Sequence, residues 1–305
     1  KKLSEIGAMN QSAAKVRIFS DDGKCVYDPL IMRRALEYVK SFDGLISQHA
    51  QEPRLTEGAQ MNEGAVSSEL GLTGWPAIAE EAIIARDILL AEHVDSRLHI
   101  AHLTTAGGVE LVRWAKARGV KVTAEVTPHH LLLTDESVRG YDAVFKVNPP
   151  LRTQADVLAL RAGLADGTID IVATDHAPHP SEDKDCEWQA AAFGMLGLET
   201  ALSVVVKTMV ETGQLSWSQL VEKMSINPAR IAGYAEHGQE IAVGNVANLA
   251  LINTKGSWTV DRNKMASKSK NTPFDQMALP AVVTHTIYRG RLVQANSEIR
   301  EGVAE

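Results

Sequence analysis

The segment Ile-Val-Ala-Thr-Asp-His-Ala-Pro-His, at residues 171–179, joins an apolar run to a carboxylate and two imidazoles. The run is apolar without alternation, which is typical of a strand buried on both faces in a parallel sheet. In β/α folds, functional side chains lie at the carboxyl ends of such strands. The segment therefore predicts a central parallel strand that delivers Asp175 to a catalytic site.

Short apolar segments alternate with helical patterns along most of the chain. The expected strands are 16–20, 44–48, 98–103, 121–126 and 170–174, and the expected helices between them are 28–39, 76–92, 105–118 and 153–167. The helix at Asp28 begins with a typical pair, an N-capping Asp followed by Pro at the first helical position. Repeated strand–helix units predict a parallel sheet or a β/α barrel.

The pattern changes near residue 238. Segments 248–252, 282–288 and 292–294 are strand-like, so we expect a partial β/α barrel over 1–237 and a small C-terminal β domain over 238–305. Residues 256–280 are rich in Lys, Ser and Asn. We expect them to form a solvated surface loop.

Composition narrows the classes of partner. The 305 residues carry a net charge of −7, and Lys and Arg never occur in runs longer than two, so nucleic acids and anionic membrane surfaces are poor partners. Cys25 and Cys186 are far apart and suit reduced thiols in the cytoplasm. No stretch of 18 apolar residues occurs. We therefore expect a cytoplasmic protein that acts on a small molecule.

Four of the five expected strands end in a group that can bind a metal or move a proton: Asp22, His49, His102 and Asp175. A single His at the edge of a core is more often a hydrogen-bonded structural residue. Four such strand ends favour a shared metal site instead, and imidazole and carboxylate are natural zinc ligands.

Strand alternation distinguishes between neighbouring candidates. Asp22 lies on the strand face opposite Arg17, whereas Asp21 shares the face of Arg17, so Asp22 is the better ligand. The adjacent His129 and His130 point apart and are expected to support the structure rather than bind one metal together.

Several motifs together resemble the bacterial class I dihydroorotases, which belong to the amidohydrolase superfamily of metal-dependent β/α barrels. The motifs are Phe-Ser-Asp-Asp-Gly at 19–23, Gln-His-Ala-Gln-Glu at 48–52, His-Leu-Thr-Thr at 102–105, Val-Asn-Pro-Pro-Leu-Arg at 147–152 and Ala-Thr-Asp-His-Ala-Pro-His at 173–179. The resemblance extends through the tail, with Asn-Thr-Pro-Phe at 271–274. One departure is Asn248, where the family usually has Asp.

The resemblance implies a site that holds one or two zinc ions. His49 and His102 would bind one zinc ion, and Asp22 stands where relatives use a bridging carboxylate or a carboxylated lysine. Asp175 would be a metal ligand and the general acid/base. The implied reaction is the reversible cyclisation of N-carbamoyl-L-aspartate to L-dihydroorotate in pyrimidine (UMP) biosynthesis.

The resemblance also implies how substrate is held. His179 would bind a substrate carboxylate, and Asn148 the polar edge of the ring. Phe193 and Gly194 belong to a glycine-rich turn that would close over the ring with backbone groups. In the hydrolytic direction, Asp175 would move a proton to the leaving nitrogen.

One family feature is absent. The His-x-His pair on the first barrel strand has no counterpart in this sequence, so we expect the chain to be N-terminally incomplete and inactive on its own. The alternatives are a dihydroorotase-like scaffold that partners aspartate transcarbamoylase, or another cyclic amidohydrolase such as a hydantoinase or allantoinase. Those two enzymes normally place a lysine where Asp22 lies, which favours dihydroorotase. A homo-oligomer is a further expectation.

Overall fold

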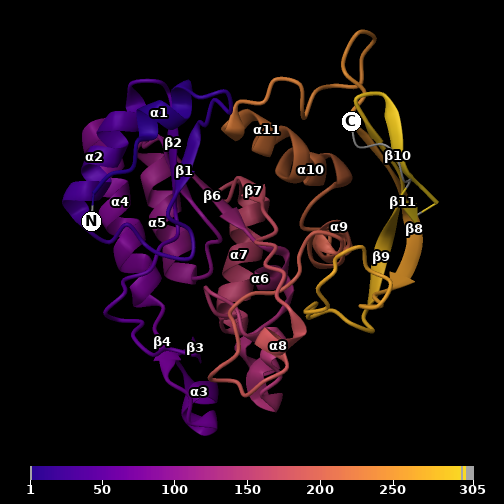
Figure 1. Ribbon diagram of the computed structural model, residues 1–305, viewed down its shortest axis with the longest axis horizontal. Coiled ribbons are helices and arrows are strands. Elements are labelled where there is room, and N and C mark those ends of the chain that lie inside the picture. The colour runs from indigo at the N-terminus through magenta and orange to yellow at the C-terminus, as the bar shows by residue number, and fades with distance from the viewer. Residues whose placement is uncertain (1, 297, 300–305) are drawn as a thin grey trace.

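Five short parallel strands form one sheet in the computed structural model, which describes residues 2–296, 298 and 299. The sheet has the order β1-β2-β5-β6-β7 (Figure 1). Its strands are β1 (Ile18–Ser20), β2 (Leu45–Gln48), β5 (Leu98–Ile100), β6 (Val122–Val126) and β7 (Ile171–Val172). All five predicted strands are confirmed, and each is shorter than expected. The sheet is not closed, and five parallel strands with covering helices agree with the predicted partial β/α barrel.

The predicted helices lie between successive strands of this sheet. They are α2 (Pro29–Lys40), α4 (Ile78–Val94), α5 (Ala106–Ala117) and α7 (Gln154–Asp166). Their starts follow the expected capping chemistry. Asp28 accepts hydrogen bonds from the first turn of α2, and Thr153 forms a capping box with Asp156 at the start of α7.

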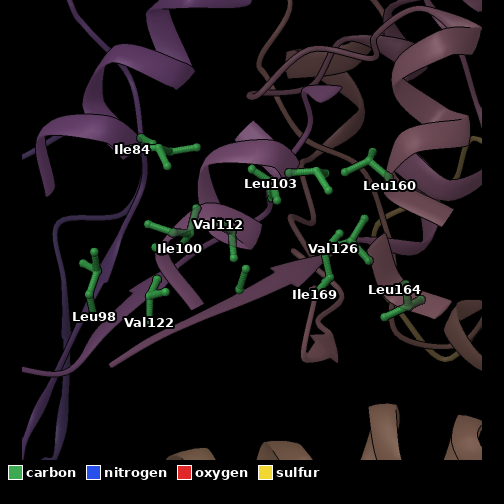
Figure 2. Packing of buried hydrophobic residues seen from close by; sticks show 14 of the residues in the cluster. Ile84, Leu98, Ile100, Leu103, Val112, Val122, Val126, Leu160, Leu164 and Ile169 are labelled. Atoms are coloured by element: carbon green, nitrogen blue, oxygen red, sulfur yellow. The ribbon is translucent and has the colours of Figure 1, made fainter. Parts of the chain in front are cut away.

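The main hydrophobic core lies between the sheet and these helices. Figure 2 shows strand residues such as Leu98, Ile100 and Val126 packed with Ile84 of α4 and Leu160 of α7. All five side chains are fully buried. Each such side chain contributes about 1.5–3 kcal/mol relative to an exposed one, so this packing holds the strands parallel and their carboxyl ends at one edge.

Further elements are not among those predicted from the sequence. They are α1 (Ile6–Gln11), β3 (Met61–Asn62), α3 (Ala65–Leu70), β4 (Gly74–Trp75), α6 (Pro128–Leu132), α8 (Ser181–Lys184), α9 (Ala201–Val205), α10 (Trp217–Val221) and α11 (Asn227–Ala232). Strands β3 and β4 pair in parallel as a separate small sheet. Among the helices described, none is long and apolar enough to cross a membrane.

A second sheet confirms the predicted C-terminal β structure. It is antiparallel, in the order β11-β10-β9-β8, with β8 (Leu249–Thr259), β9 (Ala278–Tyr288), β10 (Arg291–Ala295) and β11 (Glu298–Ile299). It lies to one side of the parallel sheet, next to α9 (Figure 1). Ser203 connects α9 to this second sheet, because its Oγ donates to the carbonyl of Ala281 in β9 and accepts from Trp258 Nε1 in β8. The domain boundary at residue 238 stays a prediction.

The prediction of a solvated loop at 256–280 is right only in part. Strands β8 and β9 occupy its two ends, and the irregular segment between them, 260–277, is exposed at 262–264 but buried at 271–274. Val260, Met265 and Phe274 are buried in a second hydrophobic cluster with Met195 and Leu196. The apolar residues are sparse and irregularly spaced among Lys, Ser and Asn, so composition alone concealed them. The segment, called the connector below, thus lies against the loop that follows β7.

Replacing Phe274 with alanine tests whether the connector belongs to the core. The Phe274 side chain is 1% exposed, so Phe274→Ala should lower the free energy of unfolding by about 3–5 kcal/mol in urea titration. Tyr288→Ala is the control, because Tyr288 is 48% exposed, and it should cost less than about 1 kcal/mol. Equal, small effects of both changes would show that the connector is not packed as described.

Candidate metal and substrate site

The predicted ligands follow four of the five strands, at one edge of the parallel sheet. Asp22 comes after β1, His49 after β2, His102 after β5 and Asp175 after β7. The strand register sets this arrangement, since Gln48 pairs with Ile100 and the Gln48 carbonyl accepts the N–H of Ala101. The two histidines are therefore brought side by side just beyond the last paired residues.

Asp22, His49 and His102 form a group suited to a metal ion. His49 Nδ1 lies 2.9 Å from His102 Nε2, and Asp22 Oδ1 lies 3.3 Å and 3.2 Å from these two atoms. Zinc ligands at about 2.0–2.1 Å in tetrahedral geometry are separated by about 3.3–3.4 Å. The triangle is thus slightly smaller than a zinc site needs, and its donors are of the types that zinc prefers.

A glutamine fixes the orientation of His49. His49 Nε2 is 2.8 Å from Gln51 Oε1, and Gln51 Nε2 donates to Thr56 Oγ1 at 2.7 Å. Because the amide oxygen can only accept, His49 carries its proton on Nε2 and presents an unprotonated Nδ1 for a metal. Gln51 belongs to the motif at 48–52, but its role was not predicted from the sequence. Its position two residues after the ligand His49 could have indicated a supporting role.

A half-buried carboxylate, that of Glu125, supports His102 on the side away from the metal ligands. Glu125 Oε1 accepts the His102 backbone N–H at 3.3 Å, and Glu125 Oε2 lies 3.0 Å from His99 Nε2. His99 in turn contacts Thr123 Oγ1 at 2.7 Å. His99 is therefore outside the ligand group but supports it through Glu125. Support matters here because His102 has a φ of +30°, a conformation that costs energy for a residue other than glycine.

The charges of the group stabilise one another. The hydrogen bond from His102 Nε2 is the main cause that holds the pKa of Asp22 well below its usual range. Burial lowers the pKa of His102, but the hydrogen bond to Asp22 and the charge of Asp175 outweigh it and raise the pKa to about 9. Without a metal, a proton on His102 therefore balances the carboxylate of Asp22.

Asp175 lies outside the compact ligand group. The group of ligand atoms that lie within 4.8 Å of one another contains Asp22, His49 and His102 only, among the described residues. Asp175 is near enough for its charge to act on His102, and burial raises its own pKa. Its φ of +45° marks a second strained backbone position at this edge of the sheet.

The predicted substrate residues lie in two loops. Asn148 Nδ2 donates weakly to Gln51 Oε1 at 3.4 Å, and Asn148 Oδ1 is buried without a hydrogen-bond partner in the part of the chain that the structure describes. His179 Nε2 is 2.9 Å from the carbonyl oxygen of Phe193. Gly194 donates its N–H to the carbonyl of Lys146 at 2.9 Å. Asn148 thus shares a partner with His49, and His179 touches the glycine-rich turn.

Within the buried pair His129 and His130, the hydrogen bonds of His130 fit the expected structural role. Both lie in α6, and His130 bonds Thr127 Oγ1 through Nδ1 and the carbonyl of Pro149 through Nε2. Burial lowers the pKa of His129 to about 3, so this imidazole is neutral. His130 therefore supports the loop that carries Asn148, whereas His129 Nε2 is buried without a hydrogen-bond partner among the described residues.

Comparison with known proteins decides the family. The model of the Amidohydrolase family matches residues 32–293. This chain belongs to the amidohydrolase family. It is 65% identical to the dihydroorotase of Streptomyces coelicolor and 55% identical to that of Mycobacterium tuberculosis, in each case over 98% of this chain and 70% of the relative. The predicted resemblance to the dihydroorotases is confirmed.

Solved structures agree on the fold. The dihydropyrimidinase of Brevibacillus agri matches with a TM-score of 0.83 at 21% identity, over 95% of this chain and 66% of that one. The L-hydantoinase of Arthrobacter aurescens matches with a TM-score of 0.81 at 27% identity, over 93% of this chain and 65% of that one. The chain thus spans just under two thirds of these structures.

The affinity of the group for metal should depend on pH. Below its pKa of about 9, His102 must lose a proton before it can bind a metal, so binding releases that proton. Apparent zinc affinity should therefore rise by up to about tenfold per pH unit from about pH 7 to about pH 8.5. Competition with a chelator measures this slope. His237→Gln, at an exposed histidine, should keep the slope, and a flat profile in the unmodified protein would contradict the charge pairing.

Proposed function

We propose that this chain carries the zinc site of a dihydroorotase, which interconverts N-carbamoyl-L-aspartate and L-dihydroorotate in pyrimidine biosynthesis. The observation that supports this best is the ligand triangle of Asp22, His49 and His102, in a chain 65% identical to a protein named dihydroorotase.

Zinc suits the donor set. Two imidazole nitrogens and one carboxylate oxygen are typical of catalytic zinc sites, which keep a further position open. A bound zinc ion would polarise the amide carbonyl of the substrate and lower the pKa of a water molecule. The Asp22 side chain is 56% exposed, which leaves room for its carboxylate to bridge to a second ion.

We infer that Asp175 carries the proton. Its side chain follows β7 at the same edge as the ligand triangle, and burial raises its pKa, so it exchanges a proton more readily than an exposed carboxylate at neutral pH. In ring opening it accepts a proton from the attacking water and delivers it to the leaving ring nitrogen. In ring closure the same carboxyl group reverses both transfers.

Asn148 and His179 are suited to bind the substrate. The buried Asn148 Oδ1 lacks a partner among the described residues, and a ring N–H of dihydroorotate would supply the missing donor. His179 contacts the Phe193 carbonyl through Nε2, which leaves its other ring nitrogen, Nδ1, for the substrate carboxylate. Phe193 and Gly194 would then form the wall over the ring.

The alternative functions have less support. A hydantoinase normally has a lysine in place of Asp22, and the L-hydantoinase match is only 27% identical. A catalytically inert scaffold has no need of the hydrogen bonds by which Gln51 and Glu125 hold the ligands. Both observations favour a working dihydroorotase.

We also propose a cytoplasmic location and a small-molecule substrate. Cys25 is a buried free thiol and Cys186 an exposed one, which suits a reducing compartment. The net charge of −7 argues against a polyanionic partner. Association with a second copy or with aspartate transcarbamoylase stays a prediction.

Asp175→Asn tests the proton carrier. In the full-length enzyme, ring opening of dihydroorotate should be about 10²- to 10⁴-fold slower in the variant, because an amide cannot exchange the proton. Zinc should stay bound, since Asp175 lies outside the ligand triangle. Ring opening is followed by ultraviolet absorbance and zinc by elemental analysis.

The control for this test is Asp43→Asn, at a carboxylate that is 71% exposed, which should leave both readings unchanged. Full activity of Asp175→Asn would refute the assigned role. Loss of zinc from it would instead place Asp175 among the essential ligands. A metal-loaded, full-length enzyme without substitutions that does not open dihydroorotate would refute the proposed function itself.

A further inference from the structure

Side chains bind three consecutive carbonyl groups of the glycine-rich turn at residues 192–197. Lys184 Nζ donates to the carbonyls of Ala192, at 2.8 Å, and Gly194, at 2.9 Å. Between them, the carbonyl of Phe193 accepts from His179 Nε2. The backbone of the turn is therefore held by long-range contacts as well as by its own conformation.

The third bond of Lys184 connects the turn to a neighbouring segment. Its Nζ donates to the carbonyl of Lys146 at 3.2 Å, and the same carbonyl accepts the N–H of Gly194 at 2.9 Å. An ammonium group has three donors, so these three carbonyls satisfy it. No described carboxylate forms an ion pair with Lys184. The ammonium group of Lys184 thus interacts with backbone carbonyl oxygens.

The connector completes the attachment from the opposite side. Asn271, which is 5% exposed, donates from Nδ2 to the carbonyls of Gly194, at 3.3 Å, and Ala177, at 2.9 Å. Its Oδ1 accepts the backbone N–H of His179 at 3.3 Å. The turn and the loop that follows Asp175 are therefore joined through one amide side chain.

Gly194 leaves no space between the turn and this loop. A Cβ at this position would lie 2.6 Å from Ala177 Cβ and 2.8 Å from His179 Nε2, and the φ of Gly194 is +136°. Any shift of the turn toward the loop would therefore displace His179. Two of the proposed substrate contacts, His179 and the wall at Phe193, depend on the same fixed backbone.

We propose that Lys184 is a positioning residue of the substrate site. By bonding the carbonyls of Ala192, Gly194 and Lys146, its ammonium group holds the 192–197 turn in the conformation that receives the substrate ring. This inference rests on the proposed function for the identity of the substrate. The positioning itself is a property of the chain and can be measured without substrate.

Lys184→Met removes the three donors while it keeps an unbranched side chain of similar length. In the zinc-loaded enzyme, we expect KM for dihydroorotate to rise about tenfold or more, because the binding-competent turn is less populated, with kcat changed by less than about threefold. Zinc content should be unchanged. Lys184→Arg keeps the charge but has a planar group, and should restore part of the affinity.

Lys223→Met is the matched control. Lys223 is 7% exposed and donates to the carbonyl of Ile169 at 2.7 Å, just before β7 and at the end of the strand away from the site. This change also removes a buried ammonium group from a backbone carbonyl. A loss of stability without a change in KM is expected, which separates a positioning role from a merely structural one.

Hydrogen exchange supplies a reading independent of the substrate. Lys184→Met should speed amide exchange in residues 193–197, where the N–H of Gly194 is protected by Lys146, and Lys223→Met should not. If Lys184→Met does not fold, Lys184→Gln is measured in the same way. Unchanged exchange in this segment, or an unchanged KM in an active enzyme, would overturn the proposal. If the unmodified enzyme is inactive on dihydroorotate, the proposed function fails and exchange alone decides the positioning role.

Discussion

The parallel pairing of β1, β2 and β5 is the constraint on which the site depends. Ser20 lies opposite Ser47, and Gln48 lies opposite Ile100, so the residues that follow each strand emerge at the same level. The register is itself fixed by burial, because a slip along the strand would move the apolar side chains out of the core. The metal ligands are thus placed by packing that involves none of them.

Packing of the connector supports the loops that carry the proposed substrate-binding residues. The connector buries Phe274 in a cluster with Met195 and Leu196, and three residues earlier it presents Asn271 to the loop after β7. Hydrophobic burial thereby places a polar side chain where it bonds backbone groups. The C-terminal sheet, which flanks the connector through β8 and β9, contributes in this way to a site formed mainly by the parallel sheet.

The sequence predicted those features that depend on local pattern. Apolar runs and capping pairs such as Asp28-Pro29 marked the strands and helices, and ligand-type residues just after the strands marked Asp22, His49 and His102. Contacts between distant segments left no such signal. Glu125 reads as one polar residue in a strand, and Asn271 as one of several in a polar segment, until folding brings them against their partners.

The ligand atoms are kept in place by bonds that do not involve them. His49 is oriented through Nε2 by Gln51, His102 through its backbone N–H by Glu125, and Asp22 through its backbone N–H by Ser20 Oγ. The three atoms that face one another are consequently free to exchange their shared proton for a metal ion without a change in these supports. Such preorganisation lowers the cost of binding, since the buried imidazoles need not be reoriented when the ion arrives.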